Sequence, residues 1–152
     1  GSQVEISESV APIHILRREL RPDSGGAGRM RGGLGQRIEV TPAGEDAFTV
    51  FLSVERIDHP AGGRSGGLPG APGRISVDDG PSLTGKGVLR IGPGERLVFE
   101  TPGGGGFGDP RTRAAEALAQ DVANGLVSAE AACNDYGVAA PVDAVATSEK
   151  KA

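Results

Sequence analysis

The first residues that could carry out chemistry lie in a glycine-rich segment, residues 21–35. Asp23, Arg29 and Arg31 place one carboxylate and two guanidinium groups among six glycines. Glycine lets the backbone close around a ligand, so this segment could present two cations and several N–H groups to a phosphate or carboxylate. The predicted substrate-binding or anion-binding residues of this segment are Asp23, Ser24, Gly25, Gly26, Arg29 and Arg31.

A structural role for the same segment is the interpretation that we favour. Asp23 would then cap a turn, because glycine-rich segments most often form turns, and the two arginines would pair with carboxylates elsewhere. The segment does not match a phosphate-binding P-loop, since the Lys-Ser/Thr ending is absent.

The run of four glycines at residues 103–106 is the second candidate. It could line a passage where a substrate, a phosphorylated intermediate or a partner backbone comes close. Asp109 and Pro110 predict that a helix begins just beyond this run. The helix N-terminus carries a partial positive charge that could attract an anion, but the anion would compete with the Asp109 carboxylate. We favour a tight strand-to-helix connection with unusual dihedral angles. The candidate residues here are Gly104, Gly105 and Gly106.

No catalytic constellation stands out elsewhere in the sequence. His14 and His59 have no companion ligand at helical or loop spacing, and Cys133 has no cationic neighbour in sequence that would activate it. Asp78 and Asp79 are adjacent in a turn and are expected to be solvated. We therefore predict no catalytic residue and no metal ligand in this chain.

A set of short strands must position these segments. Residues 48–54 alternate apolar and polar side chains, which is the period of a half-buried strand, and residues 38–40 are expected to pair with them in an antiparallel hairpin. The next segment, residues 58–73, is too rich in glycine and proline to form a regular element, and we expect it to be either functional or an interface. The other extended segments that we expect are 10–20, 74–77, 87–91 and 96–100.

Two helices are expected after the last glycine run. Asp109 is a good N-cap for a helix over residues 110–124 that Gly125 ends, and Ser128 can cap a second short helix that Gly137 ends. The sequence therefore predicts an α+β fold that is mainly β, with antiparallel strands, long glycine-rich loops and two C-terminal helices.

Composition narrows the class of protein. The 152 residues fit one domain, and the 26 glycines and 11 prolines cluster between apolar segments, which indicates a loop-rich folded domain. A formal charge of -4 with scattered arginines argues against nucleic acid and membrane surfaces as partners. The lone cysteine and the lack of an apolar run of about 20 residues favour a cytoplasmic location.

The expected organisation has three parts. The Gly1-Ser2 start is typical of a cleaved tag, so we expect a tag remnant and flexible start at residues 1–9. A single domain follows at residues 10–138, with a β part at about 10–100 and a helical part at about 109–138. Residues 139–152 are expected to form a flexible tail.

The order of the glycine segments is distinctive. DSGGAGRMRGGLG begins at Asp23, HPAG at His59 precedes Gly66-Gly67 and Pro69-Gly70, and TPGGGGFGDP begins at Thr101. In this order they resemble the C-terminal part of the B-type subunit of the hydantoinase B/oxoprolinase family. The resemblance runs from about residue 20 to 138 and includes Arg113, Asp121-Val122, residues 125–128 and residues 136–138.

This resemblance implies the C-terminal portion, or a small split subunit, of an ATP-dependent cyclic amidohydrolase or a related ketone carboxylase. The chain would shape the active site and the subunit interface. The implied partners are a hydantoinase A-type ATPase subunit and the remaining B-type portion, with a cyclic amide or ketone as substrate. ATP and a divalent metal are expected in the full complex, not on this chain alone, which is expected to be inactive by itself.

Two other functions stay open on the sequence. The chain could be a non-catalytic assembly module that docks onto catalytic subunits through its loops. It could also be a free-standing β domain that binds small anions or carbohydrates without a partner, although its few aromatic residues weaken the carbohydrate version.

Overall fold

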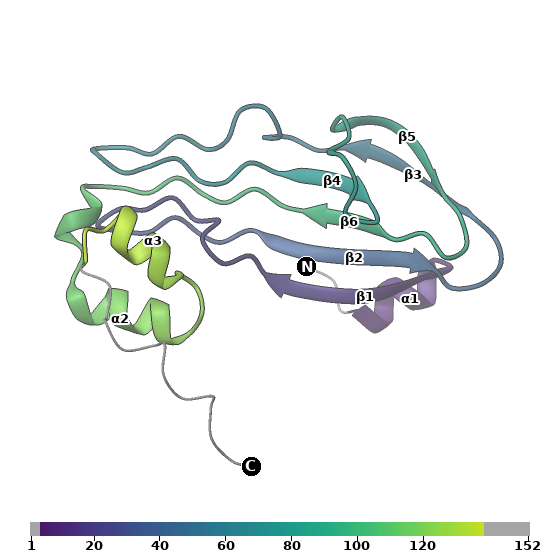
Figure 1. Ribbon diagram of the computed structural model, residues 1–152. Helices are drawn as coiled ribbons and strands as arrows, with labels where there is room; N and C mark the ends of the chain where they lie inside the picture. Colours follow the sequence, from purple (N-terminus) through teal and green to yellow (C-terminus); the bar gives the residue numbers. More distant parts are fainter. Residues whose placement is uncertain (1–3, 139–152) are drawn as a thin grey trace, which may run out of the picture.

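The computed structural model describes residues 4–138, so the predicted tail at 139–152 and the first three residues lie outside the described part. The predicted fold class, α+β and mainly β, is confirmed. The elements are α1 (Val4–Val10), β1 (Ile13–Leu20), β2 (Gln36–Pro42), β3 (Phe48–Ser53), β4 (Arg74–Val77), β5 (Lys86–Ile91), β6 (Leu97–Glu100), the 3-10 helix η1 (Pro110–Thr112), α2 (Ala115–Ala123) and α3 (Ala129–Asn134) (Figure 1).

The strands form two antiparallel sheets. One has four strands in the order β1-β2-β6-β4, and the other is the ribbon β3-β5. In the larger sheet Ile38 and Ile75 both lie opposite Phe99, so apolar residues of three strands share one face. That face packs against β3 and β5, and the fully buried Ile75 and Ile91 lie at the centre of this core. The alternating apolar side chains of β3 thus pack in the interface between the two sheets.

The predicted hairpin between residues 38–40 and 48–54 is wrong. β2 pairs with β1 and β6, whereas β3 pairs with β5. The reason is packing: Val50 and Leu52 of β3 contact the apolar core face of the large sheet, and a face-to-face neighbour cannot also be an edge neighbour. Sequence proximity alone does not distinguish the two arrangements.

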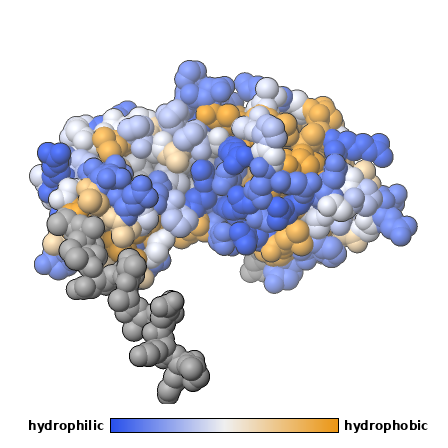
Figure 2. All heavy atoms as spheres, viewed as in Figure 1, coloured by the Kyte–Doolittle hydropathy of each residue, from blue (hydrophilic) through white to orange (hydrophobic). Residues whose placement is uncertain are grey.

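The opposite face of the four-stranded sheet is charged. Along β2, Arg37 and Glu39 alternate with the apolar residues Ile38 and Val40, and the two-residue period places the charges on the face away from the core. Figure 2 shows hydrophilic residues gathered over these strands. This sheet therefore has one apolar and one ionic face.

The glycine segments run side by side beyond one end of the four-stranded sheet (Figure 1). We call residues 24–35, 61–73 and 101–108 the glycine bundle. Backbone hydrogen bonds join them: the N–H of Gly26 donates to Gly104 (2.8 Å), that of Gly104 to Gly33 (2.9 Å), and that of Gly106 to Leu68 (2.9 Å). The bundle is therefore held mainly by backbone contacts.

The helical part closes the far end of the bundle (Figure 1). As predicted, the Asp109 carboxylate accepts the N–H of Arg111, and Ser128 caps α3 by accepting the N–H of Ala131. Gly125 and Gly137 have positive φ angles of 67° and 73°, which suits helix-ending glycines. The helices share a core with the bundle, formed by Ala27, Leu118, Val127, Ala132 and Tyr136.

The helix predicted over residues 110–124 is interrupted. η1 ends at Thr112, Arg113 and Ala114 are extended, and α2 begins at Ala115. The extended Arg113 sends its guanidinium to Asp121 and to the carbonyl of Arg29. These tertiary contacts offset the helical hydrogen bonds that are lost. The first helix, α1, was not predicted.

Candidate functional site

The four-glycine run lies in the middle of the glycine bundle. A Cβ atom on Gly103 or Gly106 would come within 3.0 Å of the carbonyl oxygen of Ser24 or Ala27, respectively. Neither glycine has a positive φ, so close backbone approach, rather than unusual dihedral angles, requires glycine here. Within the run, the space beside the predicted residues Gly104, Gly105 and Gly106 is occupied by the chain's own backbone.

Asp23 and Ser24 of the predicted anion site make structural hydrogen bonds. The Asp23 carboxylate accepts the N–H of Ser128 (2.7 Å) and so ties the first glycine segment to the start of α3. The buried Ser24 hydroxyl accepts the N–H of Gly35 (2.8 Å) and donates to the carbonyl of Arg21 (2.6 Å). The neighbouring Gly26 donates to Gly104, which brings the two predicted glycine groups together.

Arg31 pairs with a carboxylate from α2. Its guanidinium donates to both oxygens of Asp121, at 3.1 Å and 3.3 Å, and Arg113 donates to one of them at 2.7 Å. The Asp121 side chain is only 9% exposed. One buried carboxylate thus holds two arginines, which is the pairing that the structural interpretation predicted for Arg31. The partner lies within this chain.

Arg29 differs from Arg31. Its side chain is exposed and has no ion-pair partner among residues 4–138, while its N–H donates to the carbonyl of Gly108 (3.1 Å). Arg29 is therefore available to an external group. Anion binding by the predicted residues stays a prediction.

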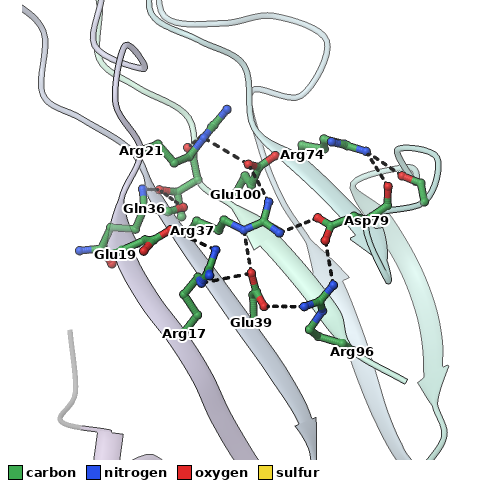
Figure 3. Close-up of polar contacts among 12 residues, drawn as sticks. Arg17, Glu19, Arg21, Gln36, Arg37, Glu39, Arg74, Asp79, Arg96 and Glu100 are labelled. Atoms are coloured by element: carbon green, nitrogen blue, oxygen red, sulfur yellow. Dashed lines mark hydrogen bonds and ion pairs between the residues drawn. The ribbon is translucent and has the colours of Figure 1, made fainter. Parts of the chain in front are cut away.

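A second polar cluster, on the ionic face of the sheet, was not predicted (Figure 3). The buried Glu39 carboxylate is 2.8 Å from Arg37 and 3.0 Å from Arg96, and Arg17 lies at 3.6 Å. Asp79 bridges Arg37 and Arg96 from the turn after β4. The alternating charges of Arg37 and Glu39 on β2 could have indicated an ionic cluster, but the residues that pair with them lie on other elements.

Asp78 and Asp79 are both exposed, as expected, but the sequence did not predict the contacts that they make. Asp78 accepts the N–H of Arg96 (3.0 Å), and Asp79 bridges two guanidinium groups although its side chain is 42% exposed. Both residues have positive φ angles, 50° and 58°. The tight turn directs these carboxylates to the arginines of β2 and of the segment before β6.

Charge pairing in this cluster shifts acid–base equilibria. Burial by itself would raise the pKa of Glu39, but the hydrogen bond from Arg37 and the charges of Arg96 and Arg17 lower it below its ordinary value. The hydrogen bond from Arg37 lowers the pKa of Asp79, and the reciprocal hydrogen bonds raise the pKa of Arg37. The cluster is therefore held in its fully charged form.

A hollow of about 790 Å³ lies where β3 leads toward the second glycine segment. Arg56, His59 and Lys86 contribute to its lining, together with apolar atoms of Val54 and Ile57. Arg56 has a positive φ of 61°, and its carbonyl accepts the N–H of Gly73 (2.9 Å). His59 is exposed, as predicted, and the hollow is open and mixed in charge.

Two classes of feature are not found in the described part of the chain. Residues 4–138 contain no group of three or more His, Cys, Asp or Glu side chains that could hold a metal ion. No helix there has the length and apolar character needed to cross a membrane. Cys133 is partly buried and free of disulfides.

Comparison with known proteins gives a consistent result. The family model described as hydantoinase B/oxoprolinase matches residues 1–110. The chain is 38% identical over 146 residues to caprolactamase subunit beta of Pseudomonas jessenii, covering 91% of this chain and 25% of that protein. It is 38% identical over 107 residues to 5-oxoprolinase 1 of Arabidopsis thaliana, covering 68% and 8%. The chain thus spans about a quarter or less of the length of these relatives.

Solved structures agree. The crystal structure of ATP-dependent caprolactamase from Pseudomonas jessenii superposes with a TM-score of 0.77 at 31% identity, over 95% of this chain and 26% of that chain. A nucleotide-free acetone carboxylase structure superposes with a TM-score of 0.71 at 24% identity, over 91% and 23%, which shows a shared fold.

Proposed function

This chain belongs to the hydantoinase B/oxoprolinase family, and on that premise we propose that it works as the C-terminal portion, or a small split subunit, of an ATP-dependent enzyme that opens cyclic amides. The observation that carries the proposal is the 38% identity to a caprolactamase beta subunit over 91% of the chain. Carboxylation of a ketone is the other reaction that the family resemblance implies.

Within such an enzyme, the chain would act as a scaffold that shapes the active site and the subunit interface. The glycine bundle supports this role, because its interior is filled by backbone of the chain itself. The Arg31–Asp121–Arg113 contact fastens α2 to the bundle and so favours a rigid unit. Rigid packing suits a surface that must hold neighbouring catalytic groups in place.

The proposed partners are a hydantoinase A-type ATPase subunit and the remaining B-type portion. ATP and a divalent metal would act in that complex. The described residues do not fit a metal, since they offer no group of three possible ligands, and we assign the metal ligands to the remaining portion. The cytoplasm is the proposed compartment.

A non-catalytic assembly role is the second candidate. The outer face of the β3-β5 ribbon favours it, because Phe51 and Val88 lie directly opposite each other and are 79% and 65% exposed. Neighbouring exposed apolar side chains favour a protein contact at this face. In this version the chain holds subunits together and leaves turnover per assembled complex unchanged.

Co-purification from the native host tests the proposal. The tagged chain, expressed with the complete subunit set, should bring down an A-type ATPase and B-type sequence, identified by mass. The assembled material should consume ATP while opening a lactam, hydantoin or 5-oxoproline, or while carboxylating a ketone. A stably folded chain that recovers neither partner and shows no ATP-dependent turnover would refute it.

Arginine variants separate the site-shaping role from the assembly role. Arg29→Ala in the assembled enzyme should lower turnover per complex if the first glycine segment shapes the site or binds an anion. Unchanged turnover together with weaker assembly would favour the assembly role. Arg56→Ala, at an exposed arginine in the segment after β3, is the matched control.

A further inference from the structure

Three side chains from separate parts of the glycine bundle stand in one row. Met30 and Phe107 exchange two backbone hydrogen bonds of 2.9 Å, so they lie directly opposite each other in an antiparallel pair. Arg64 flanks Phe107 on its other side in a parallel bridge, through 2.9 Å bonds to Gly106 and Gly108. Directly paired residues project their side chains to the same side. Met30, Phe107 and Arg64 therefore form one surface, which we call the Met-Phe-Arg row.

This row exposes apolar surface that the chain itself leaves uncovered. Met30 is 62% exposed and Phe107 is 46% exposed. The residues on either side of Phe107 are Gly106 and Gly108, which have no side chains to shield the ring. Two large apolar side chains thus project from a surface made of backbone. Side chains in this arrangement can insert into a complementary pocket of a partner.

The arginine side chains around the row are not paired with carboxylates of residues 4–138. Arg64 is exposed and has no ion-pair partner in the described part of the chain. Arg29 is in the same state, and its side chain lies beside Gly108. By contrast, Arg31 and Arg37 are paired with carboxylates. The nearby Asp109 carboxylate is used to cap η1.

We propose that the Met-Phe-Arg row docks an acidic protein surface that carries an apolar pocket, on the A-type ATPase subunit. The identity of that subunit rests on the proposed function, whereas the chemistry of the contact comes from this surface. The two unpaired guanidinium groups are complementary to carboxylates on a partner, and the two apolar side chains are complementary to a pocket that excludes water. The net charge of -4 disfavours nucleic acid as the occupant.

The test uses the full-length B-type subunit and the A-type subunit, purified separately, with their affinity measured by titration calorimetry. Met30→Ser with Phe107→Ser should raise the dissociation constant by about 10- to 100-fold. Arg64→Glu with Arg29→Glu should raise the dissociation constant by a similar factor and make it depend less on salt concentration. Leu16→Ser and Arg56→Glu, at an exposed apolar residue of β1 and an exposed arginine in the segment after β3, should leave the dissociation constant unchanged.

The outcomes separate this inference from the proposed function. If the unaltered subunits do not associate, both fail. If they associate and the Met30, Phe107 and arginine variants bind normally, only this inference fails. A lower melting temperature of the variant B-type subunit alone, with unchanged affinity, would place the row inside that subunit and also overturn the inference. Tighter binding of an oligonucleotide than of the A-type subunit, abolished by the arginine reversals, would do the same.

Discussion

Gly32 and Gly33 are adjacent in the chain but have different surroundings. A Cβ atom on Gly32 would come within 3.0 Å of the carbonyl oxygen of Gly104, whereas a Cβ atom on Gly33 would meet nothing within 4 Å. Neither residue has a positive φ. At the scale of single residues, the requirement for glycine in the bundle therefore comes from contact between segments, and it differs from one position to the next.

Alanine at these two positions should have opposite effects. Gly32→Ala must push two backbone segments apart and should lower the free energy of unfolding by about 1–3 kcal/mol or more. Gly33→Ala should be neutral or stabilise by about 0.4–1 kcal/mol, because it restricts the unfolded chain without a clash. Urea unfolding followed by circular dichroism compares them. Equal destabilisation by both would contradict the close-approach account.

The buried Asp121 gives a second residue-scale prediction. Asp121→Ala leaves Arg31 and Arg113 buried without their carboxylate, which should cost about 3–5 kcal/mol of stability. Glu116→Ala, at an exposed acid on the same helix, should change stability by less than about 0.5 kcal/mol. Thermal and urea unfolding of the two variants provide the measurement, and a similar small effect for both would show that the pairing is not structural.

At the scale of elements, the four-stranded sheet combines an apolar and an ionic face. The apolar face is covered by the β3-β5 ribbon. On the other face Glu39 is 3% exposed and is surrounded by Arg37, Arg96 and Arg17 (Figure 3). A buried carboxylate is stable there because several guanidinium groups replace its hydration. The arginines come from three segments, so the face also ties those segments together.

This ionic face should make stability depend on pH in the acidic range. The folded-state pKa values of Glu39 and Asp79 lie below the ordinary values of 4.5 and 3.8. Unfolding then takes up protons, so the stabilisation is present above pH 4.5 and is lost as the pH falls through and below these values. Unfolding free energies between pH 2 and 7 should fall more steeply for the unaltered protein than for Glu39→Gln. Parallel pH profiles would argue against this contribution.

At the scale of the whole molecule, two of the places where large apolar side chains are exposed contain such side chains in directly paired positions. One is the β3-β5 ribbon, with Phe51 and Val88, and the other is the row with Met30 and Phe107. The glycine bundle and the helical part lie beyond one end of the sheet in an elongated arrangement (Figure 1). Such a shape offers much surface for its mass, which is consistent with the proposed role within a larger assembly.

The ribbon surface predicts self-association when it has no partner. The chain in isolation should form concentration-dependent oligomers, and Phe51→Ser with Val88→Thr should shift it toward the monomer because a pair of opposite apolar side chains is removed. Sedimentation velocity over a concentration series measures the effect. A chain that stays monomeric at all concentrations, with or without the substitutions, would show that this surface does not mediate self-association.

Local interactions explain what the sequence by itself determined. The two-residue alternation identified β3, and the Asp109 and Ser128 caps and the stops at Gly125 and Gly137 were correct, because each depends on hydrogen bonds or backbone angles within a few residues. The order of the glycine segments was enough to indicate the family. Arg31 was expected to find a carboxylate partner, but the sequence did not identify it.

Only the tertiary structure decided which distant groups meet. It paired β2 with β6 instead of β3, brought Asp121 to Arg31 across 90 residues, and surrounded Glu39 with arginines from other segments. It also interrupted the helix at Arg113, whose tertiary contacts outweigh the local helical pattern. These features depend on the packing of two sheets and of backbone against backbone, which arises only when segments far apart in the chain come into contact.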